Sequence, residues 1–209
     1  MADAIVIKNL VKSFGTVKAV DDLSFKIKEG ELFAFLGVNG AGKSTTISIM
    51  CKTLDRDGGE VYIDGESIDS PSQKASRLLG VVFQNSVLDK SLSVRDNLIH
   101  RASLYGIIGK ECKERIEELS KLLSFGDFLD RAVGKLSGGQ RRKVDIARAI
   151  IHRPRILILD EPTAGLDPQT RTVMWKVIEE LRQKENMTVL LTTHYMEEAS
   201  EADFVVIID

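Results

Sequence analysis

The stretch ELFAFLGVNGAGKSTTI, residues 31–47, joins an apolar run, a glycine-rich turn and the beginning of a helix. The run ELFAFLG has the length and composition of a buried strand, and a helix is predicted from Lys43 onward. Between them, GVNGAGKST (residues 37–45) fits the phosphate-loop pattern G-x-x-x-x-G-K-[ST]. A strand that leads through such a loop into a helix predicts an α/β domain with a nucleotide site.

The residue types of this phosphate loop suit the binding of a triphosphate. Glycines let the backbone curl until its N–H groups point at phosphate oxygens, and the helix presents its positive end to the same anion. Lys43 supplies a point charge for the β and γ phosphates, the Ser44 hydroxyl can ligate Mg²⁺, and Thr45 can reach the α phosphate. The other loop residues predicted to contact nucleotide are Gly37, Asn39, Gly40, Ala41 and Gly42. The alternative is a glycine-rich turn without a ligand, which the flanking strand and helix disfavour.

A pair of carboxylates follows a second buried strand, in ILILDEP (residues 156–162). The carboxyl ends of strands in an open α/β sheet face the ligand crevice. Asp160 is therefore placed to hold Mg²⁺, and Glu161 to act as general base or to orient a water near the γ phosphate. A lone Asp-Glu pair would be a solvated acidic turn, but the phosphate loop favours a functional role. Further on, Asp167 precedes Pro168, so a helix N-cap is its simplest interpretation.

Outward from these motifs, short apolar runs alternate with helical patterns. Strands are predicted at residues 4–11, 23–27, 31–37, 59–65, 79–85, 155–160, 188–193 and 204–209. Helices are predicted from residue 43 and over residues 168–184 and 195–201. Residues 91–124 show only helical spacing, with Ser93 and Asp96 as a helix start. The pattern predicts a sheet covered on both faces and an all-helical insertion.

Composition excludes several classes of protein. A formal net charge of −2 over 209 residues carries no basic footprint for nucleic acid or anionic lipid. The longest apolar runs are too short to cross a bilayer, and the first residues lack a secretory signal. Cys51 and Cys112 are the only cysteines, far apart in sequence, so a disulfide framework is disfavoured and a reducing cytosolic setting is favoured. We interpret both cysteines as structural or incidental.

The stretch KLSGGQRRKVDIARAI (residues 135–150) begins a helix with two glycines. Ser137 and Gln140 have capping-box spacing, which accounts for a helix start but not for Gly138 and Gly139. Each glycine weakens a helix by roughly 1 kcal/mol relative to alanine. Small residues at a helix N-terminus let an anion approach the free N–H groups. The chain thus has two phosphate-binding helix starts, and one nucleotide that uses both would take them from two copies of the protein.

The motifs GVNGAGKST, LSGGQ (residues 136–140), ILILDEP, AGLD and TTH, in this order, resemble the nucleotide-binding domain of an ABC transporter. Within the family, GVNGAGKSTTI, LSVRDNL and HYMEEAS are most similar to exporters of the ABC-2 type. The resemblance implies a P-loop NTPase core with a mostly parallel sheet flanked by helices, an N-terminal antiparallel β subdomain and a helical insertion. Residues 1–84 and 136–209 would form the core with the β subdomain, and residues 85–135 the helical subdomain of one domain. Members usually continue beyond the strand that ends this chain, so truncation at the C-terminus is expected.

Roles for individual residues follow from the resemblance. Ser137, Gly138 and Gly139, with Gln140, would close over the γ phosphate of ATP bound to a partner copy. Gln84 would end its strand and contact Mg²⁺ and the attacking water. His194 would contact the γ phosphate, and Asp167 would link the two sites across the dimer. Phe14 would stack on adenine, although it could equally lie in the core. His100 and His152 match no motif and are interpreted as structural or exposed.

The resemblance implies an ATPase that cleaves ATP to ADP and phosphate with Mg²⁺, in a head-to-tail dimer. A homodimer is simpler than a heterodimer because both halves of the composite site are intact. Integral membrane permease subunits would be its partners, nucleic acid would not, and the protein would be cytoplasmic and peripheral at the inner face of the cell membrane. Two alternatives stay open at this point. One is an ABC-type ATPase of translation, chromosomes or repair, and the other is a nucleotide-regulated binding module without catalysis.

Overall fold

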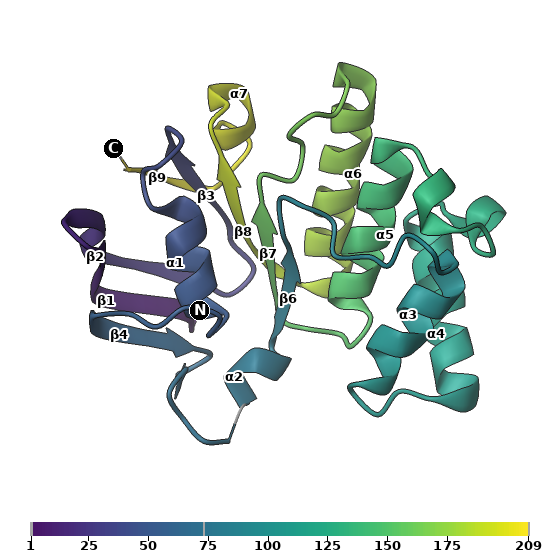
Figure 1. The fold of residues 1–209 in the computed structure, drawn as a ribbon, viewed down its shortest axis with the longest axis horizontal. Coiled ribbons are helices and arrows are strands. Elements are labelled where there is room, and N and C mark those ends of the chain that lie inside the picture. Colours follow the sequence, from purple (N-terminus) through teal and green to yellow (C-terminus); the bar gives the residue numbers. More distant parts are fainter. Residues whose placement is uncertain (1, 73, 209) are drawn as a thin grey trace.

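The computed structural model describes residues 2–72 and 74–208, so Met1 and Asp209, the ends of the predicted domain, lie outside the described ranges. Two sheets and a set of helices make up the fold (Figure 1). One sheet has the strand order β2-β1-β4-β5 and the other β6-β7-β8-β3-β9. The combination agrees with the predicted parallel α/β core and antiparallel β subdomain.

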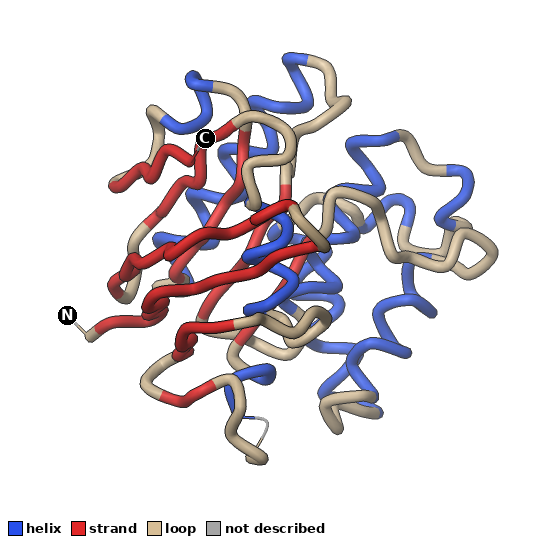
Figure 2. Tube along the Cα trace, turned by 60° about the vertical axis from the view of Figure 1, so that its left-hand side comes forward, coloured by secondary structure: helices blue, strands red, loops and turns tan. Residues whose placement is uncertain are grey.

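The antiparallel sheet is built on a long hairpin. β1 (Asp3–Phe14) and β2 (Val17–Lys28) pair as far as Phe14 opposite Val17. β4 (Gly58–Ile63) pairs with β1, and the two-residue β5 (Glu66–Ser67) completes the sheet. The strands of both sheets are red in Figure 2. Both hairpin strands exceed the predicted segments because the ladder continues through polar residues with several register shifts.

The parallel sheet is buried on both faces, as its apolar strands predict. Its strands are β6 (Leu79–Val82), β7 (Ile156–Asp160), β8 (Thr188–Thr193), β3 (Leu32–Gly37) and β9 (Phe204–Ile208). Phe33 and Phe35 of β3 pack in one hydrophobic cluster with α1 and the antiparallel sheet. Leu32 and Ala34 point to the other cluster, which is formed mainly with the larger helices. Every neighbouring pair in this sheet is parallel, so all its strands end at one edge.

Helices cover both faces of the parallel sheet. The helices nearest to it are α1 (Lys43–Met50), α2 (Lys74–Arg77), α5 (Gly138–Ile150), α6 (Pro168–Glu185) and α7 (Met196–Ala199). Residues of α1 and of α5 belong to different hydrophobic clusters, so these two helices lie on opposite faces of the sheet. Within the described ranges, every helix is too short or too polar to cross a lipid bilayer.

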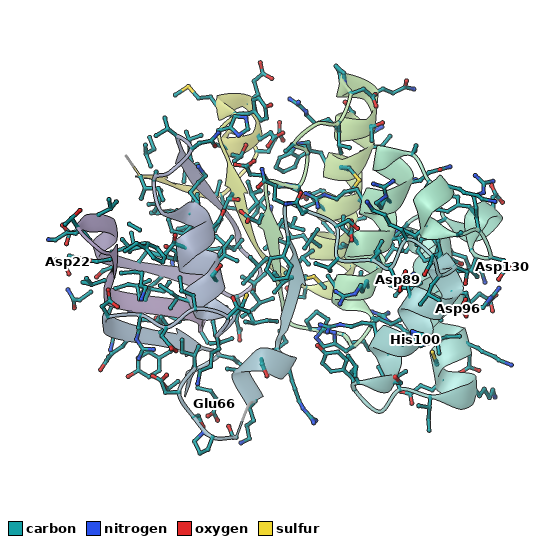
Figure 3. The ribbon with its side chains drawn as sticks, in the orientation of Figure 1. Asp22, Glu66, Asp89, Asp96, His100 and Asp130 are labelled. Atoms are coloured by element: carbon teal, nitrogen blue, oxygen red, sulfur yellow. The ribbon has the colours of Figure 1, made fainter. Side chains whose placement is uncertain are left out.

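The predicted helical insertion contains α3 (Val94–Ser103) and α4 (Gly109–Leu122), at the right of Figure 1. Two short 3₁₀ turns follow, η1 (Gly126–Phe128) and η2 (Val133–Lys135). Ser93 begins α3 as predicted, since its hydroxyl accepts from the backbone N–H of Asp96 at 3.0 Å. His100 is exposed on α3, and Figure 3 places it among these helices, well separated from α1.

Besides the hairpin strands, predicted boundaries are wrong at residues 59–65, where β4 ends at Ile63, at residues 79–85 and at residues 195–201. The strand predicted over residues 79–85 ends at Val82, whose ladder partner is Leu159, so Gln84 lies beyond the strand rather than at its end. The next carbonyl, that of Phe83, is taken by the side chain of Arg142 at 2.7 Å instead of by a strand neighbour. The helix predicted over residues 195–201 is only α7, because Tyr195 has an extended backbone.

His152 is a structural residue at the junction between the helical insertion and the core. Its ring stacks on Tyr105 with centroids 3.8 Å apart, and its Nε2 is 3.1 Å from the carbonyl oxygen of Leu79. Burial, helped by the nearby Arg101 cation, lowers the pKa of His152 to about 4. Between about pH 4 and pH 6.5, this ring is therefore mostly neutral in the folded chain and mostly protonated in the unfolded chain.

The free energy of unfolding is expected to fall as the pH drops from about 6.5 to about 4, because His152 binds a proton in the unfolded chain but not in the folded chain. His152→Phe keeps a ring that can stack on Tyr105 but cannot be protonated. Over this pH interval we expect it to lose about 1–2 kcal/mol less unfolding free energy than wild type, a figure that allows for the partial solvent exposure of His152. Urea unfolding at pH 7 and pH 4.5 measures the difference. His100→Phe is the exposed control, and equal pH slopes in wild type and His152→Phe would contradict the assignment.

Candidate nucleotide-binding site

The predicted motifs meet at the carboxyl edge of the parallel sheet. β3 runs into the phosphate loop and α1, β7 ends at Asp160, and β8 ends one residue before His194. Gln84 follows the end of β6 at the same edge. Because parallel strands end together, four segments far apart in sequence contribute to one site, near the top of Figure 1.

The phosphate loop is curled around its own lysine. The Lys43 ammonium is buried and donates to the carbonyl oxygens of Gly37, at 2.6 Å, and Val38, at 2.8 Å. Gly42 begins α1 with a φ of 89°, and a Cβ there would lie 2.2 Å from the carbonyl oxygen of Ala19 in β2. No side chain caps the first turn of α1, so its positive N-terminus is open to an anion.

Two hollows adjoin the phosphate loop. The first, of about 320 Å³, is lined by Asn39, Gly40, Gly42, Lys43, Ser44, Thr45, Gln84 and Glu161. The second, of about 500 Å³, is lined by residues of β2, the loop and β9, namely Lys18, Ala19, Val20, Asp21, Leu23, Val38, Asn39, Gly40, Ala41, Thr46, Ile207 and Ile208. Asn39 and Gly40 line both hollows, and Gly37 is the only predicted loop residue absent from the linings of these two hollows.

Asp160 is the centre of an oxygen-rich cluster. Its Oδ1 accepts from the hydroxyl of Ser44 at 3.2 Å and from that of Thr192 at 2.6 Å. Hydroxyl and carboxylate oxygens suit Mg²⁺, which takes one or two carboxylates and completes its shell with water and phosphate. The described part of the chain has no group of three or more His, Cys, Asp or Glu side chains arranged to hold a metal. This donor set fits a Mg²⁺ that arrives with a phosphorylated substrate better than a metal held by protein alone.

Glu161 lies beside two of the other predicted catalytic side chains, Gln84 and His194. Its Oε2 accepts from the Gln84 amide at 2.9 Å, and its Oε1 lies 3.6 Å from Nδ1 of His194. The Glu161 backbone is left-handed, with φ 46°, a conformation that disfavours a non-glycine residue by roughly 1–2 kcal/mol. Its N–H donates to the Thr192 hydroxyl at 2.9 Å. The surrounding bonds therefore hold a strained backbone that turns this carboxylate toward Gln84.

Arg142 is a site residue that the sequence interpretation missed. Its buried guanidinium, on α5, donates to the carbonyl oxygens of Phe83, Glu161 and Pro162, each at 2.7 Å. Burial lowers the pKa of Arg142. The signal in the sequence was a charged residue on the apolar face of an amphipathic helix.

Glu198 of α7 was also missed. It is buried and accepts from the hydroxyls of Thr163 and Thr193, the latter at 2.7 Å, with Nε of Arg171 at 3.7 Å. Thr163 follows Glu161 by two residues, and Thr193 immediately precedes His194. Glu198 therefore joins the segment after the carboxylate pair to the strand end that carries His194.

The LSGGQ segment begins α5 with the predicted capping box. The Ser137 hydroxyl accepts from the Gln140 N–H at 3.2 Å, and the Gln140 side chain accepts from the Ser137 N–H at 3.0 Å. A Cβ on Gly139 would lie 2.5 Å from Cγ2 of Thr170, so close packing within the chain is a reason for glycine here besides the predicted approach of an anion. A Cβ on Gly138 would meet only Leu166, at 3.7 Å, and Gly138 is exposed. Packing within the chain leaves Gly138 unexplained.

The two predicted phosphate-binding helix starts do not share one hollow. Ser137 and the two glycines after it are absent from the lining of both hollows, and α5 lies on the opposite face of the sheet from α1. Asp167 is exposed and caps α6, accepting from the Thr170 N–H at 3.0 Å. The hydrogen bond from the Thr170 hydroxyl lowers the pKa of Asp167.

Phe14 lies outside both hydrophobic clusters, at the end of β1. Its side chain is half-exposed, with the Lys12 ammonium 5.6 Å from the ring centroid. The alternative of a core phenylalanine is therefore wrong. Phe14 does not line the second hollow, but the same hairpin carries Ala19, which does.

Comparison with known proteins decides the family of this site. The sequence profile of the family described as "ABC transporter" matches residues 20–164, which is more than half of the chain. The chain belongs to the ABC transporter family. The match covers the phosphate loop, the LSGGQ segment and the carboxylate pair.

Curated relatives of this ABC chain are named as export and resistance proteins. The chain is 40% identical over 188 residues to the "Nod factor export ATP-binding protein I" of Burkholderia thailandensis, covering 90% of this chain and 62% of that protein. It is 37% identical over 191 residues to the "Linearmycin resistance ATP-binding protein LnrL" of Bacillus subtilis, covering 91% of this chain and 61% of that protein. The chain therefore spans about three fifths of the length of these relatives.

Solved structures of the family have the same fold. A dimeric bacterial ABC transporter cassette superposes with a TM-score of 0.86 at 28% identity, covering 98% of this chain and 94% of that one. The cbiO1 protein of Clostridium perfringens, described as part of the ABC transporter complex cbiONQ, gives a TM-score of 0.91 at 29% identity, covering 100% of this chain and 86% of that one. A post-hydrolysis dimer of an ATP-binding cassette, bound to ADP and phosphate, also matches with a TM-score of 0.86 at 29% identity, covering 98% and 94%.

Proposed function

We propose that this chain is the ATP-binding subunit of an ABC exporter, which hydrolyses ATP to ADP and phosphate to drive transport through separate membrane subunits. The observation that carries the proposal is the carboxyl edge of the parallel sheet. There an uncapped helix start and Lys43 adjoin the Asp160 cluster and the Gln84–Glu161 pair. Each group has the chemistry that phosphoryl transfer to water requires.

In this proposal the loop N–H groups and Lys43 bind the phosphates of ATP. Ser44, Asp160 and Gln84 would hold Mg²⁺, which neutralises charge on the phosphates when bound. The Glu161 carboxylate orients the attacking water or accepts its proton, while Gln84 and His194 fix the direction of that carboxylate. Phe14 would stack on the adenine at the hairpin end.

The LSGGQ segment would serve a second copy of the chain. Ser137 and Gly138 are exposed at a helix N-terminus that does not face the hollows of their own chain. A head-to-tail homodimer would bring this surface, with Gly139, Gln140 and the exposed Asp167, against ATP bound to the partner's phosphate loop. ATP then becomes part of the interface, and its hydrolysis releases the dimer.

Gly138→Ala tests this arrangement because the structure predicts no clash within the chain. In a Glu161→Gln background with MgATP, we expect the variant to keep its melting temperature but to weaken dimerisation by about tenfold or more, since a methyl group would obstruct the anion site. Analytical ultracentrifugation over a concentration series measures the dimer.

Two other glycines complete that experiment. Gly126→Ala, whose Cβ would meet only the Ser120 hydroxyl at 4.0 Å, should change neither property. Gly139→Ala should lower stability by about 1–3 kcal/mol because its Cβ overlaps Thr170. If Gly138→Ala dimerises as tightly as the Glu161→Gln parent, the LSGGQ surface is not part of the interface. If the parent forms no dimer with MgATP, the proposed dimer is wrong.

The membrane subunits would dock on the helical segment, residues 85–135. A groove of about 370 Å³ lies between this segment and the core, lined by Arg77, Tyr105, Ile107, Glu111, Glu114, Arg115, Glu118, His152 and Arg153. Leu104 and Ile108 flank it and are 73% and 66% exposed. Large exposed apolar side chains beside a groove support a protein interface. The subunit would then be cytoplasmic, at the inner face of the membrane, and the export direction rests on the relatives' names.

A further inference from the structure

One buried arginine connects the helix of the LSGGQ segment to the backbone on both sides of the Gln84–Glu161 pair. Arg142 lies two residues after Gln140, in the second turn of α5. Its Nη1 donates to the carbonyl of Phe83, and its Nη2 to that of Glu161, both at 2.7 Å. Its Nε donates to the carbonyl of Pro162 at 2.7 Å, and Nη2 also lies 3.4 Å from the carbonyl of Asp160.

We propose that Arg142 is a positioning residue for hydrolysis, which sets the Glu161 carboxylate and the Gln84 amide through their backbones. The inference rests on the proposed ATPase function and adds to it a residue that lines neither hollow beside the phosphate loop.

The backbone of Glu161 needs support from outside its own strand. It follows the last residue of β7 and adopts a left-handed φ of 46°. Its N–H donates to Thr192, and its carbonyl accepts from Arg142 and, at 3.2 Å, from the Ala164 N–H. Without the guanidinium, the peptide after Glu161 is free to relax toward an unstrained conformation. Such a rotation would turn the carboxylate away from Gln84.

The same guanidinium holds the other member of the pair. β6 ends at Val82, so Phe83 and Gln84 have no strand partner, and the carbonyl of Phe83 is bonded to Arg142 instead. The 2.9 Å hydrogen bond between Gln84 and Glu161 thus joins two segments whose backbones are both bonded to Arg142. A planar group with five N–H donors can serve several carbonyls at once, which a lysine cannot do.

Arg115 of α4 is a matched control, because its hydrogen-bond partners lie at the other end of α5. Arg115 is buried to a similar extent and donates to the carbonyl oxygens of Ile150, at 2.8 Å, and Ile151, at 3.2 Å. Its partners lie at the C-terminal end of the helix, away from the carboxyl edge of the sheet. Substituting Arg115 removes comparable structural bonds without touching the segments of Gln84 and Glu161. Arg115 also lines the groove proposed for the membrane subunits, so the variants are compared in assays of this chain without those subunits.

The test compares Arg142→Lys and Arg142→Met with Arg115→Lys and Arg115→Met in steady-state ATPase assays, nucleotide-binding titrations and thermal melts. We expect kcat to fall about tenfold in Arg142→Lys and about a hundredfold in Arg142→Met, because a misplaced catalytic group costs about this much. KM and nucleotide affinity should stay within about twofold, since the phosphate loop is untouched. The Arg115 variants should keep kcat within about twofold at temperatures where they are folded.

A double-mutant cycle adds a readout that general destabilisation would not produce. Because Arg142 acts through the pair, Gln84→Ala combined with Arg142→Met should lower kcat by less than the product of the single losses. Unchanged kcat in folded Arg142→Lys and Arg142→Met would overturn the inference, as would equal losses in the Arg115 variants. If Arg142→Met does not fold, Arg142→Lys alone decides. Wild-type protein without ATPase activity would overturn the proposed function itself, and the inference with it.

Discussion

Glu161→Gln is expected to lower ATP turnover by about 10²–10⁴-fold, the usual contribution of a general base. The amide keeps the size and hydrogen-bonding ability of the side chain but no longer accepts a proton from water. Nucleotide affinity should stay within about threefold, because Lys43 and the α1 N-terminus bind the phosphates. Phosphate release and equilibrium nucleotide titration measure the two quantities.

The same variant should accumulate as an ATP-bound dimer, since hydrolysis is the proposed route to dissociation. Size-exclusion chromatography with MgATP would then show a dimer that wild type forms only transiently. Glu197→Gln is the matched control, because it removes the same charge from an exposed residue of α7 near the same edge. Turnover near the wild-type value in Glu161→Gln would take Glu161 out of the catalytic role.

Lys43→Met should abolish measurable hydrolysis and weaken ATP binding by about 10²-fold or more, as expected for loss of charge-assisted hydrogen bonds to phosphate. Lys43 is the only cationic side chain among the described residues that line the first hollow. Methionine has nearly the same length and no charge. Isothermal titration with MgATP and with MgADP would measure the loss.

The free energy of unfolding of Lys43→Met should stay within about 1–2 kcal/mol of wild type, because the carbonyls of Gly37 and Val38 lose a donor but a buried charge is also removed. Lys52→Met removes the same charge beyond the other end of α1 and should leave affinity unchanged. Wild-type affinity in a folded Lys43→Met protein would contradict phosphate binding at the loop.

Much of the site could be predicted because its chemistry is local in sequence. The phosphate loop, the carboxylate pair and the LSGGQ helix start each consist of a few consecutive residues whose types are set by backbone geometry or charge. The capping box of Ser137 and the N-cap of Asp167 were likewise readable, since each joins residues three positions apart. The strands of the parallel sheet were found for a similar reason, because burial on both faces requires an unbroken apolar run.

Long-range contacts were not readable in the same way. Arg142 contacts Phe83, 59 residues away, and Glu198 contacts Thr163, 35 residues away, and no local pattern marks either pair. The packing of Gly139 against Thr170 also depends on how α5 meets α6. Strand ends were misjudged where a side chain replaced a ladder partner, as at Phe83.

The sequence alone determined which chemical groups this protein has and which backbone segments carry them, because loops, caps and buried strands follow from neighbouring residues. Only the tertiary structure decided which of these groups contact one another. That choice depends on parallel strands ending at one edge and on buried hydrogen bonds between distant segments. The bond between Gln84 and Glu161, and the arginine that holds both of their backbones, exist only once β6, β7 and α5 have packed together.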